Sequence, residues 1–94
     1  MAGPMSGIHK KSVVSALNLP EDVFNGEMLL TFVGSHELNV ENYRNIIFYT
    51  DTVLKLQGKH TRLTVTGKRL LVEYYDKETL KLTGQIKCAE FEPL

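Results

Sequence analysis

The feature that most constrains this chain is a change in hydrophobic period after Gly26. From that point, single polar residues separate pairs of apolar residues in four short stretches. The pairs are Leu38/Val40, Leu54/Leu56, Leu63/Val65 and Leu80/Leu82. A two-residue period places both members of a pair on one face of a β-strand. The pattern therefore predicts a small all-β domain between residues 28 and 91.

Glycine follows three of these pairs at the same offset, at Gly58, Gly67 and Gly84. Glycine allows the backbone to adopt a positive φ in a tight turn. Thr66-Gly67-Lys68 and Asp76-Lys77-Glu78 are accordingly predicted to be hairpin turns. Such short loops favour antiparallel neighbours, because parallel crossovers need a dozen or more residues. The expected fold is an antiparallel meander of seven or eight short strands, folded into a small sandwich or roll.

The first part of the chain differs from the rest. Residues 1–18 begin with small and basic residues and are predicted to be a flexible tail. Residues 19–92 are predicted to be a single domain, which suits a chain of 94 residues. The domain is expected to start with one helical turn over residues 19–24, because Pro20 suits the first helical position and acids follow it.

Composition limits the classes of partner and compartment. Eleven basic and eleven acidic residues balance, so no global field draws the chain to a polyanion. The single Cys88 excludes an internal disulfide, and its apolar surroundings predict a small buried side chain in a reduced compartment. No stretch approaches the ~20 apolar residues of a membrane span. We expect a cytoplasmic protein without a membrane span of its own.

Catalytic and metal-binding patterns are absent from the sequence. His9, His36 and His60 have no second ligand at helical or strand spacing, and one cysteine adds little to a zinc site. No serine or cysteine has an evident base beside it. We therefore expect no enzymatic activity, no cofactor, no metal and no small-molecule substrate.

Two segments depart from the alternation, namely residues 28–33 and 46–49, which are apolar at both parities. A strand of this kind shows apolar side chains to both faces of its sheet. One face of the strand packs on the core. The other face must be covered by the 19–24 turn, by a second sheet or by another molecule. Two or three such side chains left in water would cost several kcal/mol at ~25 cal/mol per Å². The sequence predicts an interface, and hence a homo-oligomer such as a dimer or a complex with another protein, through Leu29, Val33, Ile46 and Phe48.

A basic patch is the alternative. Lys59, Arg62, Lys68 and Arg69 surround the predicted Gly67 hairpin. Small β-barrels with basic turns and aromatic residues bind nucleic acids. The neutral net charge argues against this function, which remains the second hypothesis.

The order of several motifs resembles the YabP/YqfC family of sporulation proteins, over residues 19–91. The motifs are Leu19-Pro20-x-Asp22-Val23, Leu38-x-Val40-Glu41-Asn42-Tyr43-Arg44-x-Ile46, Tyr49-x-Asp51, the repeated Leu-x-Val/Leu-x-Gly, Gly84-x-Ile86 and Phe91. The stretch Glu41-Asn42-Tyr43-Arg44 is the most specific of them.

The resemblance implies a non-enzymatic protein of endospore-forming Firmicutes. It implies action in the mother-cell cytoplasm during sporulation, in association with the forespore surface, and a role in maturation of the spore envelope, either coat or cortex. Combined with the predicted interface, it favours an interaction or assembly module that binds itself or another sporulation protein. The resemblance transfers no functional residues.

Overall fold

The computed structural model describes residues 26–94, so the predicted tail and helical turn lie outside the described residues. Within that range six antiparallel strands form one open sheet and there is no helix, which confirms the all-β prediction. The strands are β1 (Leu29–Val33), β2 (Glu37–Glu41), β3 (Asn45–Tyr49), β4 (Val53–Gln57), β5 (Thr61–Tyr75) and β6 (Thr79–Pro93). Their order in the sheet is β1-β2-β6-β5-β4-β3.

The meander holds from β3 to β6, whose consecutive strands are neighbours. The β1–β2 hairpin departs from it, because β2 pairs with β6 and not with β3. The Asp76 hairpin is confirmed as the turn between β5 and β6.

The hairpin predicted at Gly67 is wrong. β5 continues through this glycine, and β6 continues through Gly84, so each strand is 15 residues long and combines two of the predicted short strands. The glycines are needed where the two backbones approach each other. A Cβ at Gly67 would lie 2.0 Å from the carbonyl oxygen of Gln85, and one at Gly84 would lie 2.5 Å from that of Arg69.

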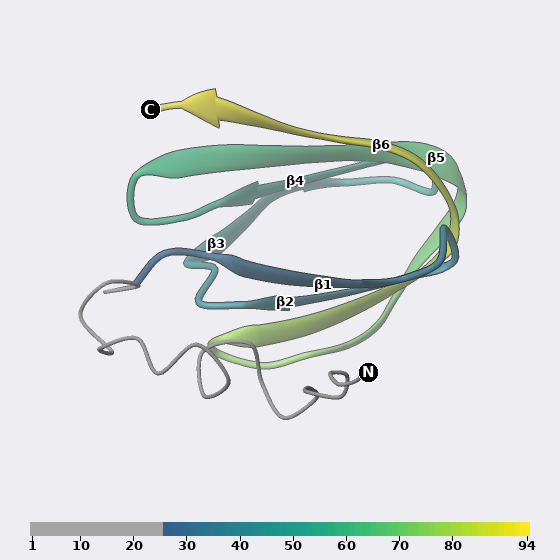
Figure 1. Ribbon diagram of the computed structural model, residues 1–94, viewed down its shortest axis with the longest axis horizontal. Coiled ribbons are helices and arrows are strands. Elements are labelled where there is room, and N and C mark those ends of the chain that lie inside the picture. The colour runs from purple at the N-terminus through teal and green to yellow at the C-terminus, as the bar shows by residue number, and fades with distance from the viewer. Residues whose placement is uncertain (1–25) are drawn as a thin grey trace, which may run out of the picture.

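The β5–β6 hairpin bends near these glycines and folds the sheet into two layers (Figure 1). The lower layer contains β1, β2, the first half of β6 and the second half of β5, because β2 pairs with residues 79–83 of β6. The upper layer contains β3, β4, the first half of β5 and the second half of β6, because β4 pairs with residues 62–66 of β5. The long hairpin is thus shared by both layers.

The turns of the two outer hairpins hold the bend in place. The β1–β2 turn accepts hydrogen bonds from β6, at 3.2 Å from Gly84 N and 2.8 Å from Ile86 N. The β3–β4 turn does the same for β5, at 3.0 Å from Gly67 N and 2.8 Å from Leu70 N. Each long strand therefore keeps a backbone partner as it passes from one layer to the other.

The core lies between the layers and is built from the alternating pairs. All eight of their side chains are at most 1% exposed, as the two-residue period predicts. Met28, Tyr43 and Leu70 complete the buried cluster. The predicted core is confirmed.

The stretch Glu41-Asn42-Tyr43-Arg44 connects the two layers. Asn42 adopts a φ of 67° and its side-chain amide donates a 3.0 Å hydrogen bond to the carbonyl of Glu27. The buried hydroxyl of Tyr43 donates to the carbonyl of Asp76, in the β5–β6 turn. Arg44 N donates a 2.7 Å hydrogen bond to Gln57 at the end of β4. The most specific motif of the sequence thus has a structural explanation.

Candidate interaction surface

In the folded sheet, β5 and β6 connect the two layers at the bend. On two other sides of the molecule, the described strands at the edges of the layers face each other without pairing. β3 and the second half of β5 border one of them, which we call the β3–β5 side. β1 and the second half of β6 border the other, the β1–β6 side, which faces the viewer in Figure 1.

A β-bulge explains why β3 has apolar residues at both odd and even positions. Ile46 and Tyr49 lie opposite Leu56 and Leu54, so they point toward the core. The register shifts between Ile46 and Phe48, and Phe48 therefore points outward opposite Lys55. Ile46 is half-buried against the core, whereas Phe48 is 50% exposed.

Exposed apolar side chains are concentrated on the two strands of the β3–β5 side. Of the ten large hydrophobic residues that are exposed in the described part, six belong to these strands. They are Ile47, Phe48, Tyr49, Leu71, Tyr74 and Tyr75. The hydroxyl of Tyr49 accepts a 2.9 Å hydrogen bond from Val72 N, which places the end of β3 beside the second half of β5. Aromatic side chains are enriched in the buried centres of protein interfaces.

The predicted interface residues do not come together. Leu29 and Val33 lie on β1, opposite Glu41 and Glu37, and point away from the core. Ile46 and Phe48 lie on β3, at the opposite end of the strand order. Only Phe48 and Val33 are exposed, and they belong to different sides of the molecule. The predicted interface did not include Tyr74 and Tyr75, which are the exposed aromatic residues of β5. Their adjacency in the sequence was the signal that could have found them.

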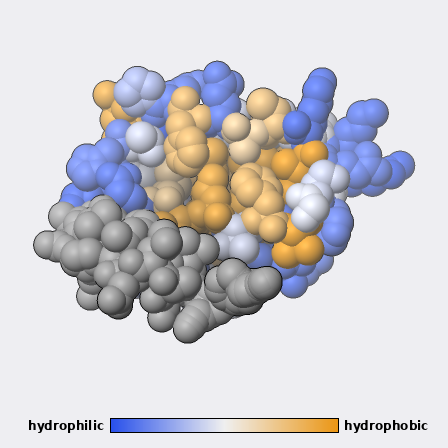
Figure 2. All heavy atoms as spheres, viewed as in Figure 1, coloured by the Kyte–Doolittle hydropathy of each residue, from blue (hydrophilic) through white to orange (hydrophobic). Residues whose placement is uncertain are grey.

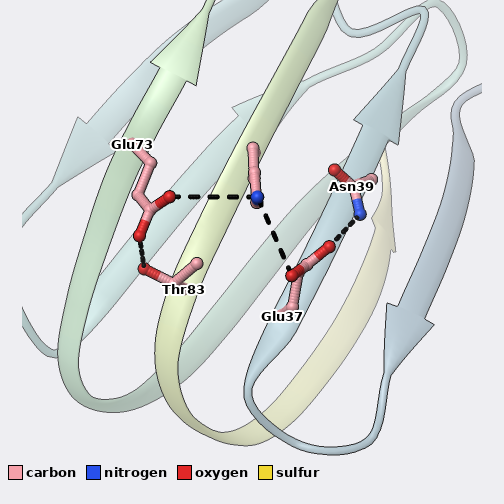
Figure 3. Close-up of polar contacts among 5 residues, drawn as sticks. Glu37, Asn39, Glu73 and Thr83 are labelled. Carbon is pink, nitrogen blue, oxygen red and sulfur yellow. Dashed lines mark hydrogen bonds and ion pairs between the residues drawn. The ribbon is translucent and has the colours of Figure 1, made fainter.

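The outer face of the lower layer is polar and internally paired (Figure 3). Lys81 Nζ lies 3.9 Å from a carboxylate oxygen of both Glu37 and Glu73. Asn39 donates a 2.9 Å hydrogen bond to Glu37, and Thr83 donates one of 3.0 Å to Glu73. The charges of Glu37, Lys81 and Glu73 are thus paired with one another across three strands.

The predicted basic residues do not form one cluster. Lys59 lies in the β4–β5 turn and Arg62 at the start of β5, where its guanidinium is 3.8 Å from Glu92. Lys68 and Arg69 lie at the bend, where the structure has no hairpin. Arg62 and Lys68 are six positions apart along β5, which corresponds to about 20 Å in a straight strand. The nucleic-acid hypothesis loses the hairpin on which it was based.

Cys88 is exposed, so its predicted burial is wrong. It lies opposite Thr66, next to the pair of the buried Val65 with Ala89, so it points to the outer face of the sheet. The register shifts between Thr66 and Gly67, and this irregularity breaks the two-residue alternation between Ile86 and Cys88.

Metal-binding side chains are not grouped in the described range, where no three His, Cys, Asp or Glu residues are placed to hold an ion. His60 Nδ1 lies 2.6 Å from Glu27 Oε2. This contact connects the β4–β5 turn to the segment just before β1. Between residues 26 and 94 there is also no helix long and apolar enough to cross a membrane.

Comparison with known proteins places these features in context. The profile of the YabP family matches residues 25–93. The uncharacterized protein YqfC of Bacillus subtilis (strain 168) is 24% identical over 82 residues, which cover 87% of this chain and 88% of YqfC. No solved structure matches the chain.

Proposed function

This chain belongs to the YabP family, and from that premise we propose that it is a non-enzymatic assembly module of sporulation. In this proposal it acts in the mother-cell cytoplasm at the forespore surface and serves maturation of the spore envelope, coat or cortex. Its partner is a second copy of the chain, another sporulation protein, or both. The partner binds the β3–β5 side.

The observation that carries the proposal is the exposure of Phe48, Tyr49, Tyr74 and Tyr75 on two neighbouring edge strands. Burying aromatic side chains of this size yields about 1.5–3 kcal/mol each relative to leaving them in water. A few such anchors supply most of the binding energy in many interfaces. On the outer face of the lower layer, Lys81 is paired with Glu37 and Glu73, and Tyr74 is the exposed aromatic residue opposite Lys81.

The position of β3 in the sheet adds a second means of binding. Among the strands of residues 26–94, β3 pairs only with β4, so within this range the backbone groups on its other edge have no strand neighbour. An edge of this kind can accept an additional strand through main-chain hydrogen bonds. The bulge at Ile47 restricts that pairing to short stretches, because it interrupts the regular spacing of donors and acceptors.

Sedimentation velocity at micromolar concentrations tests self-association. We expect Phe48→Asp to convert the oligomer to a monomer, because a charge at this position must be desolvated in the interface. Val33→Asp is the matched control, since Val33 is similarly exposed but lies on β1. It should leave the oligomer intact.

Capture from sporulating cells tests binding to another protein. The wild-type chain and Val33→Asp should retain the same sporulation protein, and Phe48→Asp should lose it. The proposal fails if the wild-type chain is a monomer and the folded Phe48→Asp variant retains every partner.

A further inference from the structure

The β1–β6 side leaves two inward-pointing phenylalanines about half exposed. We call the stretch of this side that contains Phe32 and Phe91 the opening. Phe91 of β6 lies opposite Leu63, and Phe32 of β1 lies opposite Leu38. Directly opposed residues point to the same face of a sheet, so both phenylalanines point toward the interior. Leu63 and Leu38 are fully buried, yet Phe91 is 49% exposed and Phe32 is 44% exposed. Figure 2 shows apolar residues gathered across the middle of this side, between the two layers.

A second copy of the chain fits this side poorly. If β6 paired with itself in an antiparallel manner about Phe91, Glu90 of each copy would lie opposite Glu92 of the other. Like charges directly opposite each other destabilise a sheet. β1 is also only five residues long, about 17 Å. This is short for a stable interface, which buries about 800 Å² per partner.

The described part of the chain begins at one end of this side, just before β1. The side chain of Met28 packs on Gly58, and the carboxylate of Glu27 contacts His60. His60 directly precedes Thr61, which lies opposite Pro93 at the end of β6. The residues just before β1 are therefore close to the end of β6, at the mouth of the opening.

The segment before Gly26 has a suitable length and composition to fill the opening. Residues 13–24 carry six large apolar side chains, which are Val13, Val14, Leu17, Leu19, Val23 and Phe24. Twelve residues span about 18 Å as a helix and more when extended, so the segment reaches along the whole of β1. The similarity to YqfC covers 82 residues, more than residues 26–94 contain, so it extends into this segment.

We propose that residues 13–24 bind across the β1–β6 side and cover Phe32 and Phe91. The segment is tethered at the mouth of the opening, so its effective concentration is in the millimolar range. At equal intrinsic affinity it therefore outcompetes a free partner present at micromolar concentration. The chain closes this side itself, and the β3–β5 side is left for partners. The inference does not depend on the proposed function.

Tryptophan fluorescence of the full chain tests the proposal, because the protein has no tryptophan of its own. Phe91→Trp places a reporter in the opening, and Phe48→Trp is the control, since the two phenylalanines are equally exposed in the described structure. We expect acrylamide to quench the Phe91→Trp reporter much less than the Phe48→Trp reporter at a dilution where the chain is monomeric and Phe48 is not covered by a partner. The quenching of the Phe91→Trp reporter itself should be the same at every protein concentration.

Charges are then added to the covering segment in both reporter proteins. Leu17→Asp combined with Phe24→Asp should raise quenching of the Phe91→Trp reporter severalfold and shift its emission to longer wavelength. The Phe48→Trp reporter should not change. Leu17→Ala combined with Phe24→Ala gives the same test with a smaller expected effect, should the charged variant fail to fold.

Three results would overturn the proposal. The first is quenching of the Phe91→Trp reporter that equals that of the control. The second is shielding that survives substitution of the segment in a folded protein. The third is shielding that disappears on dilution, which would identify a second copy as the occupant.

Discussion

Gly67 is required at its position because of a neighbouring backbone. Its φ is not positive, but an added Cβ would lie 2.0 Å from the carbonyl oxygen of Gln85 and 3.1 Å from the Cα of Ile86. Backbone atoms cannot rotate away, so the two long strands would have to separate at the bend.

We expect Gly67→Ala to lower the free energy of unfolding by about 1–3 kcal/mol, as overpacking commonly does. Urea denaturation measures this change. Lys68→Ala is the control, because Lys68 is exposed next to the bend, and it should stay within about 0.5 kcal/mol of the wild type. Equal stability of the two variants would show that the strands do not approach each other closely here.

Asn42 makes two separable contributions, a positive φ and a side-chain hydrogen bond to the carbonyl of Glu27. Asn42→Gly keeps the backbone conformation and loses the hydrogen bond, which should cost about 0.5–1.5 kcal/mol. Asn42→Ala also forces a side chain into the left-handed region, which adds about 1–2 kcal/mol. Thermal unfolding compares the variants, and an alanine variant as stable as the glycine variant would argue against the left-handed conformation.

At the scale of the element, the β5–β6 turn depends on one carboxylate. Asp76 accepts hydrogen bonds from the backbone of Glu78 at 2.9 Å and of Thr79 at 2.8 Å, and from the hydroxyls of Tyr74 and Thr79. These bonds favour the ionised carboxylate and hold the pKa of Asp76 well below its usual 3.8. The backbone donors of Glu78 and Thr79 make the largest contributions to this shift. The aspartate therefore stabilises the turn only while it is ionised.

This pKa shift predicts a pH dependence of the turn. A lowered folded-state pKa contributes stability above the unfolded-state value, and the contribution is lost as the pH falls below 3.8 toward the folded-state value. We expect wild type to melt at a higher temperature than Asp76→Asn at pH 7, and the difference to shrink below pH ~4. Melting curves from pH 7 to pH 2 measure it. A difference that stays constant would assign the effect to the shape of the side chain and not to its charge.

At the scale of the whole molecule, the shared β5–β6 hairpin should make the two layers unfold together. Each layer contains half of both long strands, so neither layer keeps its central strands if the hairpin opens. In native-state hydrogen exchange, we expect Leu63 in the upper layer and Leu82 in the lower layer to exchange with the same, highest free energy. The edge strands β1 and β3 should exchange faster. Different free energies for the two central positions would mean that the layers are separate units.

The sequence by itself determined the strand class and the core, because the side-chain period of two is a local property of an extended chain. Leu54, Leu56 and their counterparts were therefore predicted correctly as buried. It also marked β3 as unusual, although the bulge that turns Phe48 outward depends on pairing with β4. The role of Phe48 in an interface stays a prediction.

Only the tertiary structure decided which strands lie at the edges of the sheet and which glycines lie in turns. Local pattern cannot distinguish Gly67, where two backbones meet, from a hairpin glycine, because the clashing atom belongs to Gln85, 18 residues away in sequence. The exposure of Cys88 follows from the register of β6 against β5, and the separation of Val33 from Phe48 follows from strand order. Both properties are likewise non-local. The change in period after Gly26 thus specified what packs inside, while the bend of β5 and β6 determined which apolar side chains remain outside.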